Sequence, residues 1–289
     1  MKIHHLLGAM CLCFGIGTLS AQNYQKTSSG IRTTVNAVDI EVQFFAPAVV
    51  RVIKSPEGVA YAKQSLSVIA KPEEVHFKTA IKDNRIVLNS SDLSICVDTR
   101  TGVVSYLSKS GKTLLTEKNG VQFTPFDDAG TKTYHVYQPF ALDKEEAIYG
   151  LGQLQNGKMI QRNMTKNLVQ GNVEDVSPFF QSTKGYGVFW DNYSPTLFTD
   201  NETETSFRSE VGDCVDYYFM YGKNADGVIA QVRSLTGQAP MFPLWTYGYW
   251  QSKERYKSQE EVVDVVRKYR ELGVPLDGII QDWQYWGHN

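Results

Sequence analysis

An acidic residue near the end of the chain is surrounded by apolar and aromatic residues. It is Asp282, in the segment GIIQDWQYWG at residues 278–287. A carboxylate can accept hydrogen bonds from two sugar hydroxyls at once, and bonds to a charged acceptor are about twice as strong as neutral ones. Trp283, Tyr285 and Trp286 offer rings that suit the C–H face of a sugar. The segment is compatible with sugar binding, but the residues alone favour the alternative, in which Asp282 caps a following helix and the aromatic residues pack under a loop.

The residues before Asp282 predict the elements that position it. Ser258 and Glu261 form a capping box, apolar residues then recur at helical spacing, and Gly273 ends the helix. An apolar strand ending at Trp250 precedes this helix, and a second strand leads to Asp282. Strand, helix and strand make a βαβ unit with parallel strands.

A βαβ unit cannot cover both faces of its own strands, so it belongs to a larger sheet or barrel. A (β/α)8 barrel takes about 250 residues, and only residues 244–289 follow Pro243. We therefore expect the first βαβ unit of a truncated barrel. Barrel enzymes place substrate-contacting residues at the carboxyl ends of strands, which predicts that Trp250 and Asp282 face one opening.

The preceding part of the chain is β-rich. In VDIEVQFF, residues 38–45, apolar and polar side chains alternate, which predicts a strand with one buried face. Turn dipeptides at residues 101–102 and 110–111 separate further short apolar runs, a pattern typical of an antiparallel sandwich. A short helix is predicted within residues 224–237. The expected fold is thus β-rich and then α/β, with a sandwich at residues 22–238 and the start of a barrel at residues 239–289.

The first 21 residues have the pattern of a signal peptide. Lys2 is followed by an apolar run and then by small residues up to Ala21. The run is shorter than the roughly 20 apolar residues that span a bilayer, and no later segment approaches that length. We expect an exported protein, periplasmic or extracellular, with no integral membrane segment in the mature chain. A lipid anchor at Cys11 or Cys13 is the less favoured alternative.

Composition excludes several partners. The chain has 29 Lys and Arg against 31 Asp and Glu, with no basic run, so nucleic acid is not expected as a partner. The histidines lack metal-ligand spacing, and the glycines after residue 149 lack a phosphate-binding pattern, so neither metal nor cofactor is predicted. Cys96 and Cys214 can form one disulfide, but two buried free thiols are favoured. The sequence carries no signal for the oligomeric state.

Three segments together resemble glycoside hydrolase family 31, the retaining α-glucosidases and α-xylosidases. They are EEAIYGLGQ, GYGVFWDNYS, and the segment from PLWTYGYWQS to GIIQDWQYWG. Their order and spacing carry the resemblance, which covers nearly all of the chain after residue 21. It implies a mutarotase-like β-sandwich, followed by a (β/α)8 barrel that hydrolyses oligosaccharides. The form IIQDWQYWG is more similar to the α-xylosidases of the family.

The resemblance also implies roles for particular residues. Asp282 matches the acid that holds hydroxyls of the terminal non-reducing sugar, and Trp250 matches an aromatic on the pocket floor. Trp286 is a further predicted substrate contact, on the ground that its ring suits a sugar face. A sandwich loop within residues 152–172 would reach the active-site rim, with Asn163 as a sugar contact or as an ordinary polar loop residue. The family's nucleophile and acid/base aspartates would fall beyond Asn289, so no catalytic residue is assigned here.

Two hypotheses follow. In the first, the chain is the N-terminal part of an exported retaining α-glycosidase and is inactive alone. In the second, it is a non-catalytic carbohydrate-binding protein or a remnant of such an enzyme. Hydrolysis of an aryl α-glycoside by this chain would contradict the predicted inactivity, and aggregation through uncovered strand edges would count against the second hypothesis.

Overall fold

The computed structural model describes residues 24–61 and 63–283. The chain divides into two compact units, Met1–Gly237 and Gln238–Asn289, and each is described by itself. The predicted signal peptide, Tyr285 and Trp286 lie outside the described residues. Within the described residues, no helix has the length and apolar character needed to cross a membrane.

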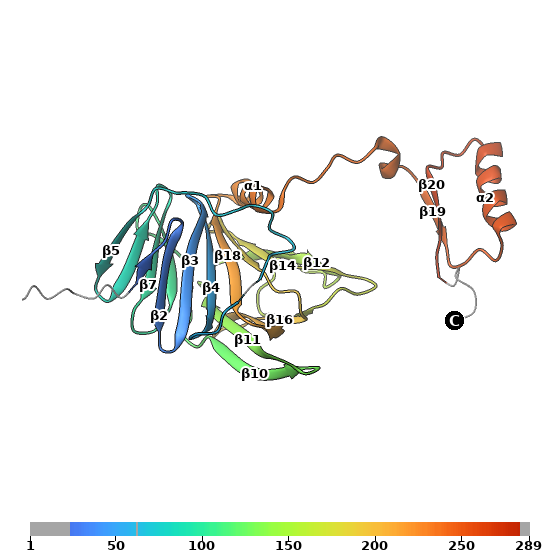
Figure 1. Ribbon diagram of the computed structural model, residues 1–289. Coiled ribbons are helices and arrows are strands. Elements are labelled where there is room, and N and C mark those ends of the chain that lie inside the picture. Colours follow the sequence, from blue (N-terminus) through green and yellow to red (C-terminus); the bar gives the residue numbers. More distant parts are fainter. Residues whose placement is uncertain (1–23, 62, 284–289) are drawn as a thin grey trace, which may run out of the picture. The chain divides into compact units, whose positions relative to one another are not determined.

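The N-terminal unit contains two antiparallel sheets, drawn as layers in Figure 1. Among the described residues, eight strands form the first sheet. In spatial order they are β1 (Gln25–Lys26), β2 (Gly30–Val35), β3 (Val38–Ala46), β4 (Val49–Pro56), β18 (Val215–Tyr221), β15 (Tyr186–Trp190), β14 (Asp175–Ser182) and β12 (Ile148–Gln153).

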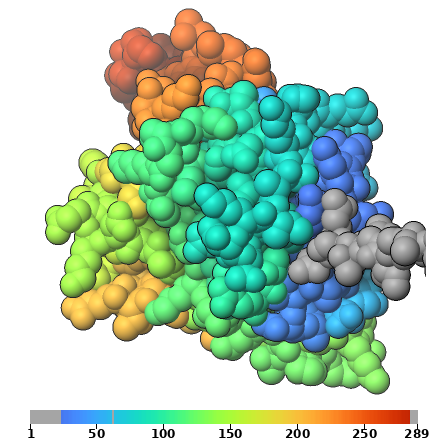
Figure 2. Space-filling model, turned by 90° about the vertical axis from the view of Figure 1, so that its left-hand side faces the viewer, coloured from blue at the N-terminus to red at the C-terminus, as the bar shows by residue number. Residues whose placement is uncertain are grey.

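The second sheet has ten strands within the described residues. Nine of them follow the order β13 (Met164–Leu168), β16 (Thr196–Asp200), β17 (Thr205–Gly212), β11 (Thr131–Ala141), β9 (Thr113–Glu117), β8 (Val104–Ser108), β7 (Leu93–Asp98), β6 (Arg85–Asn89) and β5 (Lys78–Lys82). The tenth, β10 (Gln122–Asp128), pairs with β11 in a long hairpin. Figure 2, which views the unit from the β5 side, shows residues near position 100 in the middle of this face.

The core lies between the two sheets and is rich in aromatic rings. Tyr106 of the second sheet stacks on Phe219 of the first, with ring centroids 3.9 Å apart. Trp190 stacks on Phe207 in the same way at 5.3 Å. These four side chains are fully buried between the sheets, which confirms the β-sandwich predicted from the alternating sequence.

One ion pair is buried between the sheets. Lys54 Nζ lies 2.5 Å from Glu117 Oε2, and the two side chains are 3% and 0% exposed. The backbone N–H of Val104 also donates to Glu117 Oε2, and the hydroxyl of Tyr217 donates to Oε1. Because each charge has several partners, burying this pair is tolerated.

Helix α1 (Ala225–Thr236) covers part of the outer face of the first sheet. Asn224 caps its first turn, since its side-chain oxygen accepts the N–H of Gly227 at 2.8 Å. The buried residues of this contact share apolar character and form a small second core; they are Phe45, Val49, Val68, Tyr218, Met220, Val228 and Leu235. The helix predicted within residues 224–237 is therefore confirmed.

The YGLG segment forms an irregular part of β12. The pairing of β12 with β14 shifts register between Gly150 and Gly152. Gly152 has φ +100°, and a Cβ atom there would lie 2.1 Å from the carbonyl oxygen of Asp175. Only glycine fits so close to a neighbouring strand in this conformation, which explains why the segment is glycine-rich.

The C-terminal unit contains the predicted βαβ arrangement. Its elements are the 3-10 helix η1 (Leu244–Tyr247), β19 (Trp250–Lys253), α2 (Gln259–Glu271) and β20 (Gly278–Gln281). Strands β19 and β20 are parallel. Ser258 caps α2 by accepting the N–H of Glu261, and Gly273 follows the helix with φ +67°. The helix boundaries are as predicted.

Candidate active site

Asp282 directly follows the last residue of β20 and is exposed in the C-terminal unit. Its Oδ1 accepts the backbone N–H of Trp283 at 2.7 Å, so one oxygen is engaged in a local turn. The preceding residue, Gln281, donates from Nε2 to the carbonyl oxygen of Tyr256 at 3.3 Å and ties the strand end to the loop after β19. The carboxylate thus sits at the carboxyl end of a parallel strand. Its contact with sugar stays a prediction.

Trp250 is placed differently from the prediction. The strand was expected to end at Trp250, but β19 begins there, because Pro243 opens the short helix η1 instead of a strand. Trp250 pairs with Gly278 at the start of β20. At about 3.3 Å per residue, it lies roughly 13 Å along the strands from the level of Asp282. The expected strand end is therefore wrong, and the sugar-binding role of Trp250 stays a prediction.

The ring of Trp250 has a structural contact that the sequence did not reveal. A Cβ atom at Gly278 would lie 2.3 Å from Cε3 of Trp250, so the ring packs directly on the glycine backbone. Its indole Nε1 donates to the carbonyl oxygen of Thr246 at 3.3 Å. These contacts fix the ring against β20.

Polar side chains join β19 to α2 beside this strand pair. The hydroxyls of Tyr249 and Tyr269 both donate to Oε1 of Gln251, at 2.6 and 2.8 Å. These hydrogen bonds hold helix α2 against strand β19. They thereby help to make rigid the strand pair β19–β20, which Asp282 directly follows.

Asn163 belongs to the N-terminal unit, where it is exposed at the end of a loop before β13. It adopts φ +52°, a left-handed conformation that Asn tolerates better than most residues. It lines a cavity of about 330 Å3 together with Lys144, Arg162, Glu202 and other residues. The position is open to a ligand, and its role as a sugar contact stays a prediction.

Arg162 and Asp200 anchor Asn163, and sequence reasoning missed both. Arg162 Nε donates to Asp200 Oδ2 at 2.9 Å, and the Asp200 side chain is 0% exposed. The backbone N–H of Asn163 donates to the same oxygen at 2.6 Å. Arg162 also donates to the carbonyl oxygens of Asp143 and Glu146, which tethers the loop to the chain before β12. The only clue in the sequence was Asp200 itself, the acid that ends the segment TLFTD at residues 196–200.

Both remaining cysteines are free thiols, as favoured from the sequence. Cys214 is buried, whereas Cys96 is half-buried. Burial, followed by the charge of Asp216, raises the pKa of Cys214 to about 12. Among residues 24–61 and 63–283, no group of three His, Cys, Asp or Glu side chains is arranged to hold a metal ion.

Two family models match the chain in sequence. Residues 39–198 match the glycosyl hydrolase 31 N-terminal galactose mutarotase-like domain. Residues 239–289 match the glycosyl hydrolases family 31 TIM-barrel domain. The predicted fold class, a mutarotase-like sandwich followed by the start of a barrel, is confirmed by these matches and by the sheets described above.

Curated relatives and solved structures agree with these matches. The chain is 37% identical over 262 residues to an α-xylosidase of Saccharolobus solfataricus, covering 88% of this chain and 36% of that protein. It is 26% identical over 262 residues to α-glucosidase 2 of Bacillus thermoamyloliquefaciens, covering 85% of this chain and 32% of that protein. A family 31 α-xylosidase structure from Xanthomonas citri superposes with a TM-score of 0.82 at 21% identity, covering 91% of this chain and 46% of the other.

These alignments define how much of the relatives this chain represents. It spans about a third of the length of the two curated relatives. The structural likeness to the Xanthomonas citri enzyme, at 21% identity, establishes the shared fold.

Proposed function

Because this chain belongs to glycosyl hydrolase family 31, we propose that it is the N-terminal part of an exported retaining α-glycosidase. The proposed substrate is an oligosaccharide with a terminal non-reducing α-linked sugar. The observation that carries this proposal is the 37% identity to an α-xylosidase over most of the chain. An α-xyloside is therefore the preferred substrate class, and an α-glucoside is the second.

Asp282 is the proposed sugar-holding residue. It lies at the carboxyl end of β20, where a barrel opens toward substrate. Its carboxylate is exposed and suited to accept hydroxyl hydrogen bonds. In this proposal the bond-breaking carboxylates come from later barrel strands. Residues 1–289 alone therefore bind part of the sugar and do not hydrolyse it.

The first measurement is the coding sequence past the codon for Asn289. An open frame that continues for several hundred residues and encodes further aspartate-bearing strands would support the proposal. A stop codon there would instead support the second hypothesis, a non-catalytic carbohydrate-binding or remnant protein. Hydrolysis of an aryl α-xyloside or α-glucoside by a purified protein of residues 1–289 would contradict the proposed inactivity of this chain.

The role of Asp282 is tested in the complete enzyme. Asp282→Ala removes two charge-assisted hydrogen bonds to substrate and is expected to lower kcat/KM for an aryl α-xyloside about 100-fold or more. Asp264→Asn is the matched control, because Asp264 lies on α2 in an exposed ion pair with Arg267. Unchanged kcat/KM in Asp282→Ala would overturn the assigned role.

A further inference from the structure

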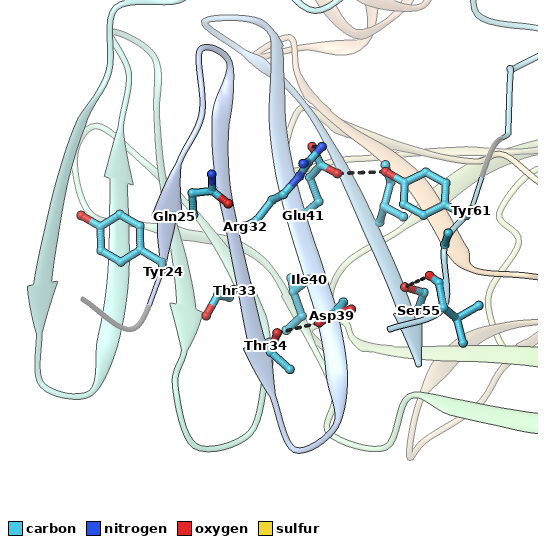
Figure 3. A pocket seen from close by; sticks show the side chains of 13 residues that line it. Tyr24, Gln25, Arg32, Thr33, Thr34, Asp39, Ile40, Glu41, Ser55 and Tyr61 are labelled. Atoms are coloured by element: carbon cyan, nitrogen blue, oxygen red, sulfur yellow. Dashed lines mark hydrogen bonds and ion pairs between the residues drawn. The ribbon is translucent and has the colours of Figure 1, made fainter. Parts of the chain in front are cut away.

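A polar cavity lies on the outer face of the first sheet, and none of the residues assigned above lines it. Its volume is about 730 Å3, within the range of about 300–1,000 Å3 that small-molecule sites occupy. Strands β2, β3 and β4 form its floor, and the segment after β4 forms one wall (Figure 3). Helix α1 covers the apolar part of the outer sheet face at Phe45, Val49 and Tyr218, none of which lines this cavity.

The strand register arranges the floor in two rows. In the first row Arg32 of β2 pairs with Glu41 of β3, which pairs with Ile53 of β4. In the second row Thr34 pairs with Asp39, which pairs with Ser55 of β4. Side chains two residues apart on a strand share a face, so the polar groups of both rows point to the same side.

Glu41 organises the first row. Its side chain accepts hydrogen bonds from Arg32 Nη2 at 3.0 Å, Gln43 Nε2 at 2.6 Å and the Tyr61 hydroxyl at 2.9 Å. Residue Glu41 is 8% exposed, whereas the Arg32 side chain is 60% exposed. Figure 3 shows Tyr61 reaching Glu41 from the wall while Arg32 reaches it from β2. The guanidinium and the phenol ring are therefore held in place before any ligand binds.

Asp39 organises the second row. Its Oδ1 accepts the Thr34 hydroxyl at 2.6 Å, and its Oδ2 accepts the backbone N–H of Gly58 at 2.9 Å. The wall segment is tied down by this bond and by the Tyr61 contact to Glu41. Tyr24 stands at the other side of the cavity, where its hydroxyl donates to Thr79 at 2.9 Å.

The charges of the cavity select the kind of ligand. Two carboxylates, Asp39 and Glu41, face a single guanidinium, Arg32, so a phosphate, a sulfate or a uronic acid meets net repulsion. On this face of the sheet the isoleucine of the floor, Ile53, is 1% exposed, which leaves little apolar floor for a lipid. A neutral molecule rich in hydroxyls can both donate to the carboxylates and accept from the guanidinium, with tyrosine rings at its sides.

We propose that this cavity is a second, non-catalytic binding site for a neutral oligosaccharide. Arg32 and Asp39 hydrogen-bond its hydroxyls, and Tyr61 lies beside a sugar ring. The proposal rests on the geometry of the N-terminal unit and does not require that the chain hydrolyse anything.

The test is calorimetric titration of the protein of residues 1–289 with maltotetraose and xylotetraose, and with trigalacturonate as the charged comparison. We expect at least one neutral tetrasaccharide to bind with a Kd of about 1 mM. Arg32→Gln is expected to weaken this binding at least about tenfold, since a charge-assisted bond is lost. Arg85→Gln, an exposed change on β6 outside the cavity, is the matched control and should leave the Kd unchanged.

Two further variants keep the outcome interpretable. Thr34→Ala, at an exposed position of β2, should leave the melting temperature unchanged and weaken binding about threefold. Asp282→Ala should not alter this binding, because Asp282 is not among the residues that line the cavity. Absence of binding, unchanged binding in both cavity variants, preferential binding of trigalacturonate, or loss of binding only in Asp282→Ala would each overturn the proposal.

Discussion

The contact between Arg162 and Asp200 gives the most specific stability prediction for the N-terminal unit. Asp200 is buried, and its carboxylate is compensated by Arg162, by the N–H of Asn163 and by the hydroxyl of Thr205 at 2.5 Å. Arg162→Ala leaves a buried carboxylate with two of these three donors. Breaking a buried pair on one side costs about 3–5 kcal/mol. Since two donors remain, we expect the lower end, about 3 kcal/mol.

The free energy of unfolding is measured by urea unfolding and the melting temperature by thermal unfolding, each followed by far-UV circular dichroism. About 3 kcal/mol corresponds to a melting temperature lower by roughly 6–12 °C for a domain of this size. Arg100→Ala is the control, because Arg100 is an exposed residue in the turn after β7, and it should stay within about 0.5 kcal/mol of wild type. Hydrogen exchange should also accelerate at Asn163, whose amide donates to the same carboxylate.

A double-mutant cycle decides whether the ion pair is responsible. Combining Arg162→Ala with Asp200→Ala should give a coupling energy above about 1 kcal/mol, because the second change removes the charge that the first leaves unpaired. A loss below about 1 kcal/mol in Arg162→Ala, or a coupling energy near zero, would refute the reasoning.

Three other predictions concern single positions in the N-terminal unit. Lys54→Met alone should destabilise the sandwich by about 3–5 kcal/mol in urea unfolding, whereas adding Glu117→Leu should restore only part of that loss, because the N–H of Val104 and the hydroxyl of Tyr217 then lose their acceptor. Burial raises the pKa of Cys214 from 9.0 to about 12, so above pH 9.0 the unfolded thiol loses its proton while the folded thiol keeps it. The stability that the protonated Cys214 thiol contributes is fully present below pH 9.0 and is lost as pH rises toward about 12. Between about pH 8 and about pH 10.5, the free energy of unfolding in urea should therefore decline less in Cys214→Ala than in the wild type. Gly152→Ala should cost about 1–3 kcal/mol, because the new Cβ meets a backbone carbonyl of β14, whereas Gly58→Ala has open space and should cost less.

The fold class was predictable because its signals are local. Alternation over residues 38–45 identified a strand with a core-facing side, and Ser258 with Gly273 marked the ends of α2. The order of the three family-like segments was equally readable, and it identified the family. The strand and helix signals depend on residues that are close in sequence, where periodicity and capping act directly, whereas the family was identified from the order of segments that lie far apart.

The strand at Trp250 shows where local reading failed. Pro243 and the aromatic residues after it suggested an extended strand, but a proline with its fixed φ also suits the turn that became η1. Where β19 begins is set by its pairing with β20 across α2, with Trp250 opposite Gly278. A short apolar run carries no information about that register.

By itself, the sequence determined the sandwich, the βαβ unit and the presence of an acid after its second strand, and it favoured free thiols over a disulfide. Tertiary structure alone decided that Arg162 meets Asp200, 38 residues away, and that Arg32, Glu41 and Tyr61 converge on one cavity. These contacts join residues whose separation along the chain carries no periodic signal. They exist only because sheet register and strand order bring distant side chains to the same face.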